Sequence, residues 1–207
     1  NRQPLKKCLT QMSGVKMGCT NYVYLLDQKV PEFSANSVIC LDEDVKTHLK
    51  GKNFKTVVIL PGNLPPDQLI FEHLYNLPAD DAFWQNNLQF SREVFTNTAG
   101  REVIRELAIS GAQVDLKERL AAYQGNKVKR DIFKNFYNSS DIQSLVAARV
   151  KPLNAWSHWV KKNPNATNVF LESFKTALYG VMKNGFAVDD AKLTALEVKL
   201  KKVSHVL

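Results

Sequence analysis

Two aspartates stand where an apolar segment ends. The stretch SVICLDEDV, residues 37–45, places Asp42 and Asp44 two positions apart after a run of apolar residues. In a strand, residues i and i+2 face the same side, so we expect the two carboxylates to project together. Hard oxygen ligands suit Mg²⁺ or Mn²⁺. The alternative is an aspartate that caps the following helix, and this short motif alone does not separate the two interpretations.

A third aspartate follows the next apolar segment. The stretch VVILPGNLPPDQLIFEHL ends in a Pro-Gly turn and brings Asp67 into the first turn of a predicted helix. The carboxyl ends of neighbouring parallel strands meet at one edge of a sheet, so Asp67 is expected near Asp42 and Asp44. An acid in the first turn also complements the helix dipole, which gives Asp67 a structural alternative. Glu72 is expected to be a surface or interhelical residue.

The elements that would position these acids form a small α/β layer. Residues 36–42 and 55–61 are short, apolar and β-branched, which is typical of strands buried on both faces. A short helix or irregular crossover is expected between them. Upstream, the sequence predicts a strand at Val15–Met17, a turn, and a helix through Leu26. The order of these elements favours a small parallel sheet.

The rest of the chain has helical periodicity. Pro at the helix start and the spacing of the leucines predict a helix after residue 65, and helical segments continue towards the C-terminus. The fold class is therefore α/β: a small parallel-sheet layer followed by a mainly α-helical C-terminal part. We expect a boundary within residues 77–83, with an α/β domain at 1–80 and a helical domain at 81–207.

The acidic region resembles a known family. The segment VKMGCTNYVYLLDQKVPEFSANSVICLDEDVK, followed by VVILPGNLPPDQLIFEHL, is similar to a Toprim domain. The likeness is greatest to the Toprim module of OLD-family ATPase–nucleases, which act in antiphage defence. It covers roughly residues 12–80, and RDIFKNFYN and PLNAWSHWVKKN resemble the helical tail of such proteins more faintly.

The resemblance implies a metal-dependent nuclease. In that family a first glutamate, a DxD motif and further acids bind one or two Mg²⁺ ions for phosphodiester cleavage. Asp42 and Asp44 match the DxD, and Asp67 matches the acid after the following strand. The resemblance also implies a downstream lysine near the scissile phosphate, for which Lys134 is the candidate. DNA is the implied substrate.

Two parts of the family pattern have no counterpart in this sequence. Residues 1–14 contain no Glu or Asp that would match the early glutamate, and no GxxxxGK[ST] phosphate-binding loop is present. One expectation is a C-terminal fragment, whose ATPase domain belongs to the same protein or a partner chain. The rival is a degenerate Toprim that binds nucleic acid without cutting it.

A basic helix is predicted downstream. In GNKVKRDIFKNFYN, Lys127, Arg130 and Lys134 follow helical spacing on one stripe, beside Phe133, Phe136 and Tyr137. The functional interpretation is a face that contacts the phosphates of a nucleic acid. The alternative is an amphipathic helix with solvated cations. The aromatic residues are expected in the core under either interpretation.

Composition sets the wider limits. The formal net charge of +8 favours a polyanionic partner such as nucleic acid. The three cysteines match no zinc pattern and suit a reducing compartment, so the cytoplasm is the expected location. No apolar stretch approaches the ~20 residues of a membrane helix. Leu193, Leu196, Leu200 and Val203 predict a docked terminal helix, with a contact between two copies as the alternative.

Three functions are compatible with the sequence. The first is the Mg²⁺- or Mn²⁺-dependent nuclease part of an OLD-like protein. The second is a non-catalytic module that binds nucleic acid or protein within a larger assembly. The third is another Toprim chemistry, such as that of a topoisomerase or primase, whose strand transfer needs a nucleophilic tyrosine. Tyr22 and Tyr24 lie in the helix predicted before the DxD, and no neighbouring residue in the sequence would activate either.

Overall fold

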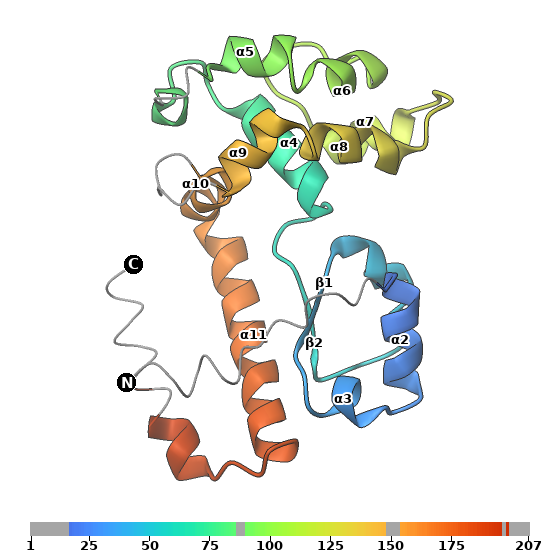
Figure 1. Ribbon diagram of the computed structural model, residues 1–207, viewed down its shortest axis with the longest axis vertical. Coiled ribbons are helices and arrows are strands. Elements are labelled where there is room, and N and C mark those ends of the chain that lie inside the picture. The colour runs from blue at the N-terminus through green and yellow to red at the C-terminus, as the bar shows by residue number, and fades with distance from the viewer. Residues whose placement is uncertain (1–16, 86–89, 148–153, 196–197, 199–207) are drawn as a thin grey trace. The chain divides into compact units, whose positions relative to one another are not determined.

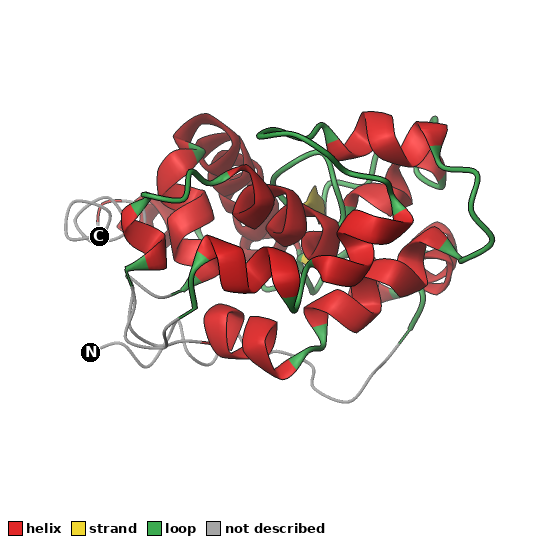
Figure 2. Cartoon of the chain, turned by 90° about the horizontal axis from the view of Figure 1, so that it is seen from above, coloured by secondary structure: helices red, strands yellow, loops and turns green. Residues whose placement is uncertain are grey.

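A computed structural model describes residues 17–85, 90–147, 154–195 and 198 of the chain (Figure 1). The described part has a two-stranded parallel sheet near its beginning and is mainly helical after it (Figure 2). The predicted fold class is therefore confirmed. The elements are α2 (Cys19–Asp27), α3 (Pro31–Ser34), β1 (Ile39–Leu41), η1 (Glu43–Thr47), β2 (Val57–Ile59), α4 (Pro66–Asn76), η2 (Ala82–Trp84), α5 (Arg92–Asn97), α6 (Arg101–Glu106), α7 (Leu116–Ala122), α8 (Lys129–Tyr137), α9 (Ser140–Ala147), α10 (Ala155–Lys162) and α11 (Pro164–Asn184).

Contacts between residues divide the chain into two compact units. The first unit comprises residues 1–41, 45–57 and 177–207, and the second comprises residues 42–44 and 58–176. These units combine early and late parts of the chain. The division into domains at 1–80 and 81–207 therefore stays a prediction.

The first unit contains helices α2 and α3 and strand β1. Lys52 pairs with Asp27 across this unit, and the buried hydroxyl of Thr56 donates to the carbonyl oxygen of Phe33. The ring of Tyr22 packs edge-on against Phe33 at a centroid distance of 6.0 Å. Tyr22 therefore has a packing role in this unit. Within the described part of the first unit, the buried apolar residues are Val23, Leu26, Ile39, Leu41, Val45, Ala177, Val181 and Leu193.

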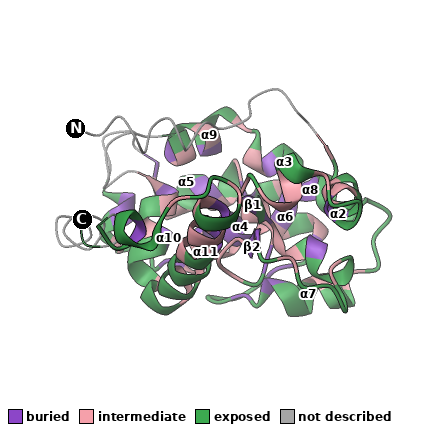
Figure 3. Cartoon of the chain, turned by 90° about the horizontal axis from the view of Figure 1, so that it is seen from below, coloured by how far each residue is buried: buried purple, intermediate pink, exposed green. Residues whose placement is uncertain are grey.

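The second unit is built around Phe71 of α4. This side chain is fully buried, and its ring lies 5.3–5.9 Å from four other aromatic rings, those of Tyr75, Phe95, Phe133 and Phe136. These rings join α4 to α5 and α8, so α4 is the central helix of this core. The expectation that the aromatic residues of α8 belong to the core is confirmed. Figure 3 shows that most helices carry both buried and exposed residues.

Side-chain caps fix where several helices begin. The side chain of Ser91 accepts the Val94 N–H at the start of α5, Asp115 accepts the Glu118 N–H at α7, and Asn154 accepts the Ser157 N–H at α10. Each cap satisfies a backbone donor that has no partner within its own helix. These polar residues therefore set the helix boundaries that apolar periodicity leaves open.

The strands differ from their prediction in length and burial. Each pairs over only three residues, and Cys40 is exposed between the buried residues Ile39 and Leu41. The expectation of strands covered on both faces is wrong for β1, because one of its faces is open. The strand predicted at Val15–Met17 lies outside the described residues except for Met17, which is not in a strand. Leu196, Leu200 and Val203 also lie outside them.

Candidate functional site

Asp42 and Asp44 are placed by the end of strand β1, but not within it. The strand ends at Leu41, Asp42 follows it directly, and Asp44 lies in the 3-10 helix η1. The strand alternation that predicted their common side therefore does not apply. Partial burial raises the pKa of Asp44, and the charge of Asp42 raises it further. The two carboxylates therefore still interact.

A tight turn precedes Asp67 in the chain. After β2 the backbone turns at Gly62, which has φ of +101°, and a Cβ there would come within 2.8 Å of the Leu69 side chain. Glycine is therefore required at this position. Pro66 then begins α4, and Asp67 stands in the first turn with its Oδ1 accepting the N–H of Gln68 at 2.9 Å.

The charges around Asp67 link it to the DxD segment. Burial raises the pKa of Asp67, and the hydrogen bond from Gln68 and the charge of Arg130 oppose that shift. The charge of Asp44 raises this pKa further. The charge of Asp42 acts on Asp44 and the charge of Asp44 acts on Asp67, so the three predicted acids are linked electrostatically. We call Asp42, Asp44 and Asp67 the acidic cluster.

Arg130 is the basic residue that the structure adds to this cluster. It lies exposed in the first turn of α8. Burial raises the pKa of both Asp44 and Asp67, and the charge of Arg130 opposes that rise. Opposite charges shift each other in this way only when they are close. The sequence identified Arg130 as a contact for phosphate but gave no sign that it lies beside the acids.

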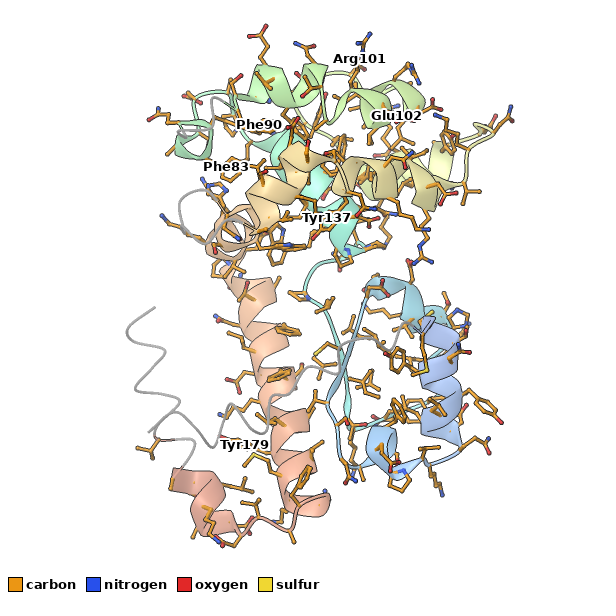
Figure 4. All side chains as sticks on the ribbon, in the orientation of Figure 1. Phe83, Phe90, Arg101, Glu102, Tyr137 and Tyr179 are labelled. Atoms are coloured by element: carbon orange, nitrogen blue, oxygen red, sulfur yellow. The ribbon has the colours of Figure 1, made fainter. Side chains whose placement is uncertain are left out.

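The other two members of the predicted basic stripe have different partners. Lys127 Nζ lies 2.7 Å from Glu102 Oε1 and 3.0 Å from Glu106 Oε1, both on α6. These contacts raise the pKa of Lys127. Lys134 forms an exposed ion pair with Asp131 of the same helix at 3.4 Å. Glu102, one of the two partners of Lys127, is labelled on α6 in Figure 4.

The stripe is interrupted because α8 starts later than the pattern predicts. Its first residue is Lys129 and Val128 is its extended N-cap, so Lys127 precedes the helix. Only Arg130 and Lys134 share helical geometry there. The continuous face of Lys127, Arg130 and Lys134 is therefore not formed.

Glu72 has a structural role between helices. Its Oε2 accepts the backbone N–H of Leu116, the first residue of α7, at 2.7 Å. Burial raises the pKa of Glu72, and this hydrogen bond opposes the shift. The expectation of an interhelical role for Glu72 is confirmed. The Trp159 side chain is likewise buried in the core.

The acidic cluster has the donor atoms that a hard metal ion prefers, but not the arrangement of a complete metal site. Carboxylate oxygens are the ligands that Mg²⁺ and Mn²⁺ prefer, and the like charges of Asp42 and Asp44 would be relieved by a cation. Within residues 17–85, 90–147, 154–195 and 198, however, no three His, Cys, Asp or Glu side chains are arranged to hold a metal ion. The donor types fit a hard cation, and the arrangement is not that of a complete site.

Comparisons with known proteins give no family. No family model matches the chain, and no curated protein or solved structure matches it either. None of the helices within the described part is long and apolar enough to cross a membrane.

Proposed function

We propose that the acidic cluster and Arg130 act on the phosphodiester backbone of DNA, with Mg²⁺ or Mn²⁺ held by Asp42, Asp44 and Asp67. The observation that carries this proposal is the clustering of charges from three separate segments. Acids from the end of β1 and the start of α4 interact with each other and with one arginine of α8. A bound ion would supply an activated water and stabilise charge on the phosphate.

Each residue has a distinct role in this proposal. The carboxylates of Asp42 and Asp44 supply hard oxygen donors, and Asp67 supplies a third or orients one of them. Arg130 contacts a non-bridging phosphate oxygen, because a guanidinium matches phosphate geometry with paired N–H donors. Lys134, which forms an ion pair with Asp131, stays a candidate for the basic residue near the scissile phosphate.

The resemblance to OLD-family nucleases supports the same chemistry from the sequence. We infer that an ATPase domain, in the same protein or in a partner, completes the activity. The arrangement of the acids leads us to expect weak metal binding and slow cleavage by the 207-residue chain alone. Rapid plasmid cleavage by this chain would contradict that expectation.

The experiment measures metal binding separately from cleavage. Mn²⁺ binding is followed by electron paramagnetic resonance, and nicking of a supercoiled plasmid is followed in the same buffer. Asp42→Asn and Asp44→Asn are expected to reduce both, whereas Asp131→Asn, an exposed acid on α8, is the matched control. Equal Mn²⁺ binding by all the variants would exclude the acidic cluster as the metal site.

The second candidate is a module that binds nucleic acid without cutting it. The absence of a three-ligand group from the described part favours this alternative, as does the formal charge of +8. It predicts affinity for DNA that falls steeply with salt and does not depend on Asp42 or Asp44. Salt-dependent binding without cleavage under any metal condition would select this candidate.

A further inference from the structure

Two histidines from distant parts of the chain meet within the second unit. His73 lies on α4 and His158 lies on α10, and His73 Nε2 is 3.0 Å from His158 Nδ1. Their ring centroids are 5.2 Å apart. A separation of 3.0 Å between ring nitrogens is that of a hydrogen bond, so one ring donates and the other accepts.

The carboxylate of Asp81 determines which ring donates. Its Oδ1 lies 3.2 Å from His158 Nε2 and its Oδ2 lies 3.1 Å from Lys162 Nζ. Burial opposes ionisation of Asp81, but hydrogen bonds from the Phe83 N–H and Lys162 lower its pKa overall. Asp81 is therefore an ionised acceptor at neutral pH, and His158 Nε2 carries the proton that it accepts.

The tautomer of His158 follows from this contact. A neutral imidazole that is protonated on Nε2 has a lone pair on Nδ1, which accepts from His73 Nε2–H. The hydrogen bonds then run in one direction, from His73 to His158 to Asp81. We call these three residues the histidine relay. Each of its links joins segments that are far apart in the sequence.

The surroundings of the relay keep both rings neutral. Burial lowers the pKa of His73 to about 4, and the charge on His158 acts in the same direction, while Asp81 opposes it. Burial also lowers the pKa of His158, which Asp81 opposes. The remaining charges that act on the relay are those of Lys161 and Lys162 on α10, and both favour neutral rings.

We propose that the histidine relay is a proton-sensitive latch that fastens α10 to α4 at neutral pH and is released by acidification. A proton taken from solvent onto His158 Nδ1 removes the lone pair that His73 uses. Two N–H groups would then face each other across 3.0 Å, and the hydrogen bond between the helices is lost. This inference does not rest on the proposed nuclease function.

The direction of the pH effect follows from proton binding. In the unfolded chain a histidine has a pKa of ~6.5, whereas in the folded chain the pKa of both rings is lower. Below ~6.5 the unfolded state binds more protons than the folded state, so the free energy of unfolding falls as the pH falls. For His73 the loss develops between ~6.5 and the folded value of about 4.

The test is the urea midpoint of the chain between neutral and mildly acidic pH. His158→Gln can accept from His73 and donate to Asp81 but cannot gain a proton. We expect the wild-type midpoint to fall on acidification and His158→Gln to remove a large part of that fall. His48→Gln is the matched control, because His48 is exposed in the other unit. The same pH dependence in wild type and His158→Gln would overturn the proposal.

A second measurement does not depend on a variant that folds. Nitrogen-15 resonances of the wild-type histidines report the tautomer and the titration midpoint of each ring. We expect His158 protonated on Nε2 at neutral pH, and His73 and His158 to titrate below the ~6.5 of a histidine in an unfolded chain. Midpoints at ~6.5 for both rings, or protonation of His158 on Nδ1 alone, would contradict the latch.

Discussion

The positive charge of Arg130 on helix α8 opposes the rise that burial causes in the pKa of Asp67, in the first turn of helix α4. The same guanidinium acts on Asp44 beyond the end of strand β1. One arginine therefore partly neutralises acids from two other segments.

Arg130→Gln is expected to weaken DNA binding and to disturb the acids. Loss of one phosphate contact reduces the slope of log K against log salt by about 0.9 on B-DNA. Because the opposing positive charge is removed, the pKa values of Asp44 and Asp67 rise further. Fluorescence anisotropy at several salt concentrations and carboxyl NMR titrations measure the two effects.

The control for Arg130 is Lys134→Gln on the same exposed face of α8. It removes an equal charge from the same helix and breaks the exposed ion pair with Asp131. We expect it to leave the titration of Asp67 nearly unchanged. Equal shifts of the Asp67 pKa in both variants would show that Arg130 acts on Asp67 no more strongly than Lys134 does.

Asp67→Asn is expected to stabilise the protein at neutral pH. Burial raises the pKa of Asp67, so the folded chain ionises less readily than the unfolded chain. Protonated Asp67 stabilises the folded chain relative to ionised Asp67. This stabilisation is complete below the pKa of Asp67 in the unfolded chain and is lost as the pH rises through its higher pKa in the folded chain. Asparagine stays uncharged and retains an oxygen for the Gln68 N–H. Thermal melts at neutral and acidic pH measure the difference, which should shrink towards low pH.

The same variant separates function from stability. If Asp67 is a metal ligand, Asp67→Asn also loses the stabilisation that Mn²⁺ gives to the wild type, because a ligand stabilises only a state that binds it. A variant that melts higher and still responds fully to Mn²⁺ would mean that Asp67 does not take part in metal binding. Asp131→Asn again provides the exposed control on α8.

Phe71→Ala is expected to destabilise the second unit strongly. The side chain is fully buried among four aromatic rings, and truncation of such a residue costs about 3–5 kcal/mol of unfolding free energy. Urea denaturation followed by tryptophan fluorescence measures the change. Val128→Ala is the control, because Val128 is 65% exposed and such surface changes stay within about 0.5 kcal/mol. Similar midpoints for the two variants would contradict the central place of Phe71.

Glu72→Ala is expected to destabilise the start of α7. The lost hydrogen bond leaves the Leu116 N–H without its carboxylate acceptor, and loss of a helix cap costs about 1 kcal/mol. Hydrogen exchange at the Leu116 amide should accelerate while exchange in α10 stays unchanged. Asp115→Ala removes the N-cap of the same helix and calibrates the effect. A protected Leu116 amide in Glu72→Ala would show that the carboxylate is not its acceptor.

Local patterns in the sequence determined the element types. Apolar β-branched runs identified β1 and β2, and Pro66 with Asp67 identified the start of α4, because these preferences depend on a few neighbouring residues. The same patterns placed Phe133 and Phe136 in the core. They overestimated strand length and assigned Lys127 to a helix that begins at Lys129, because boundaries depend on caps and pairing partners.

Tertiary structure alone decided which charged side chains meet. The sequence shows that Arg130, Lys134 and Lys127 are basic, but it does not show that Arg130 acts on Asp44 and Asp67 while Lys127 pairs with α6. The meeting of His73 with His158 likewise depends on how α4 packs against α10. Such contacts join residues that are distant in the chain. Their formation is set by the packing of the whole core, which no short segment of sequence encodes.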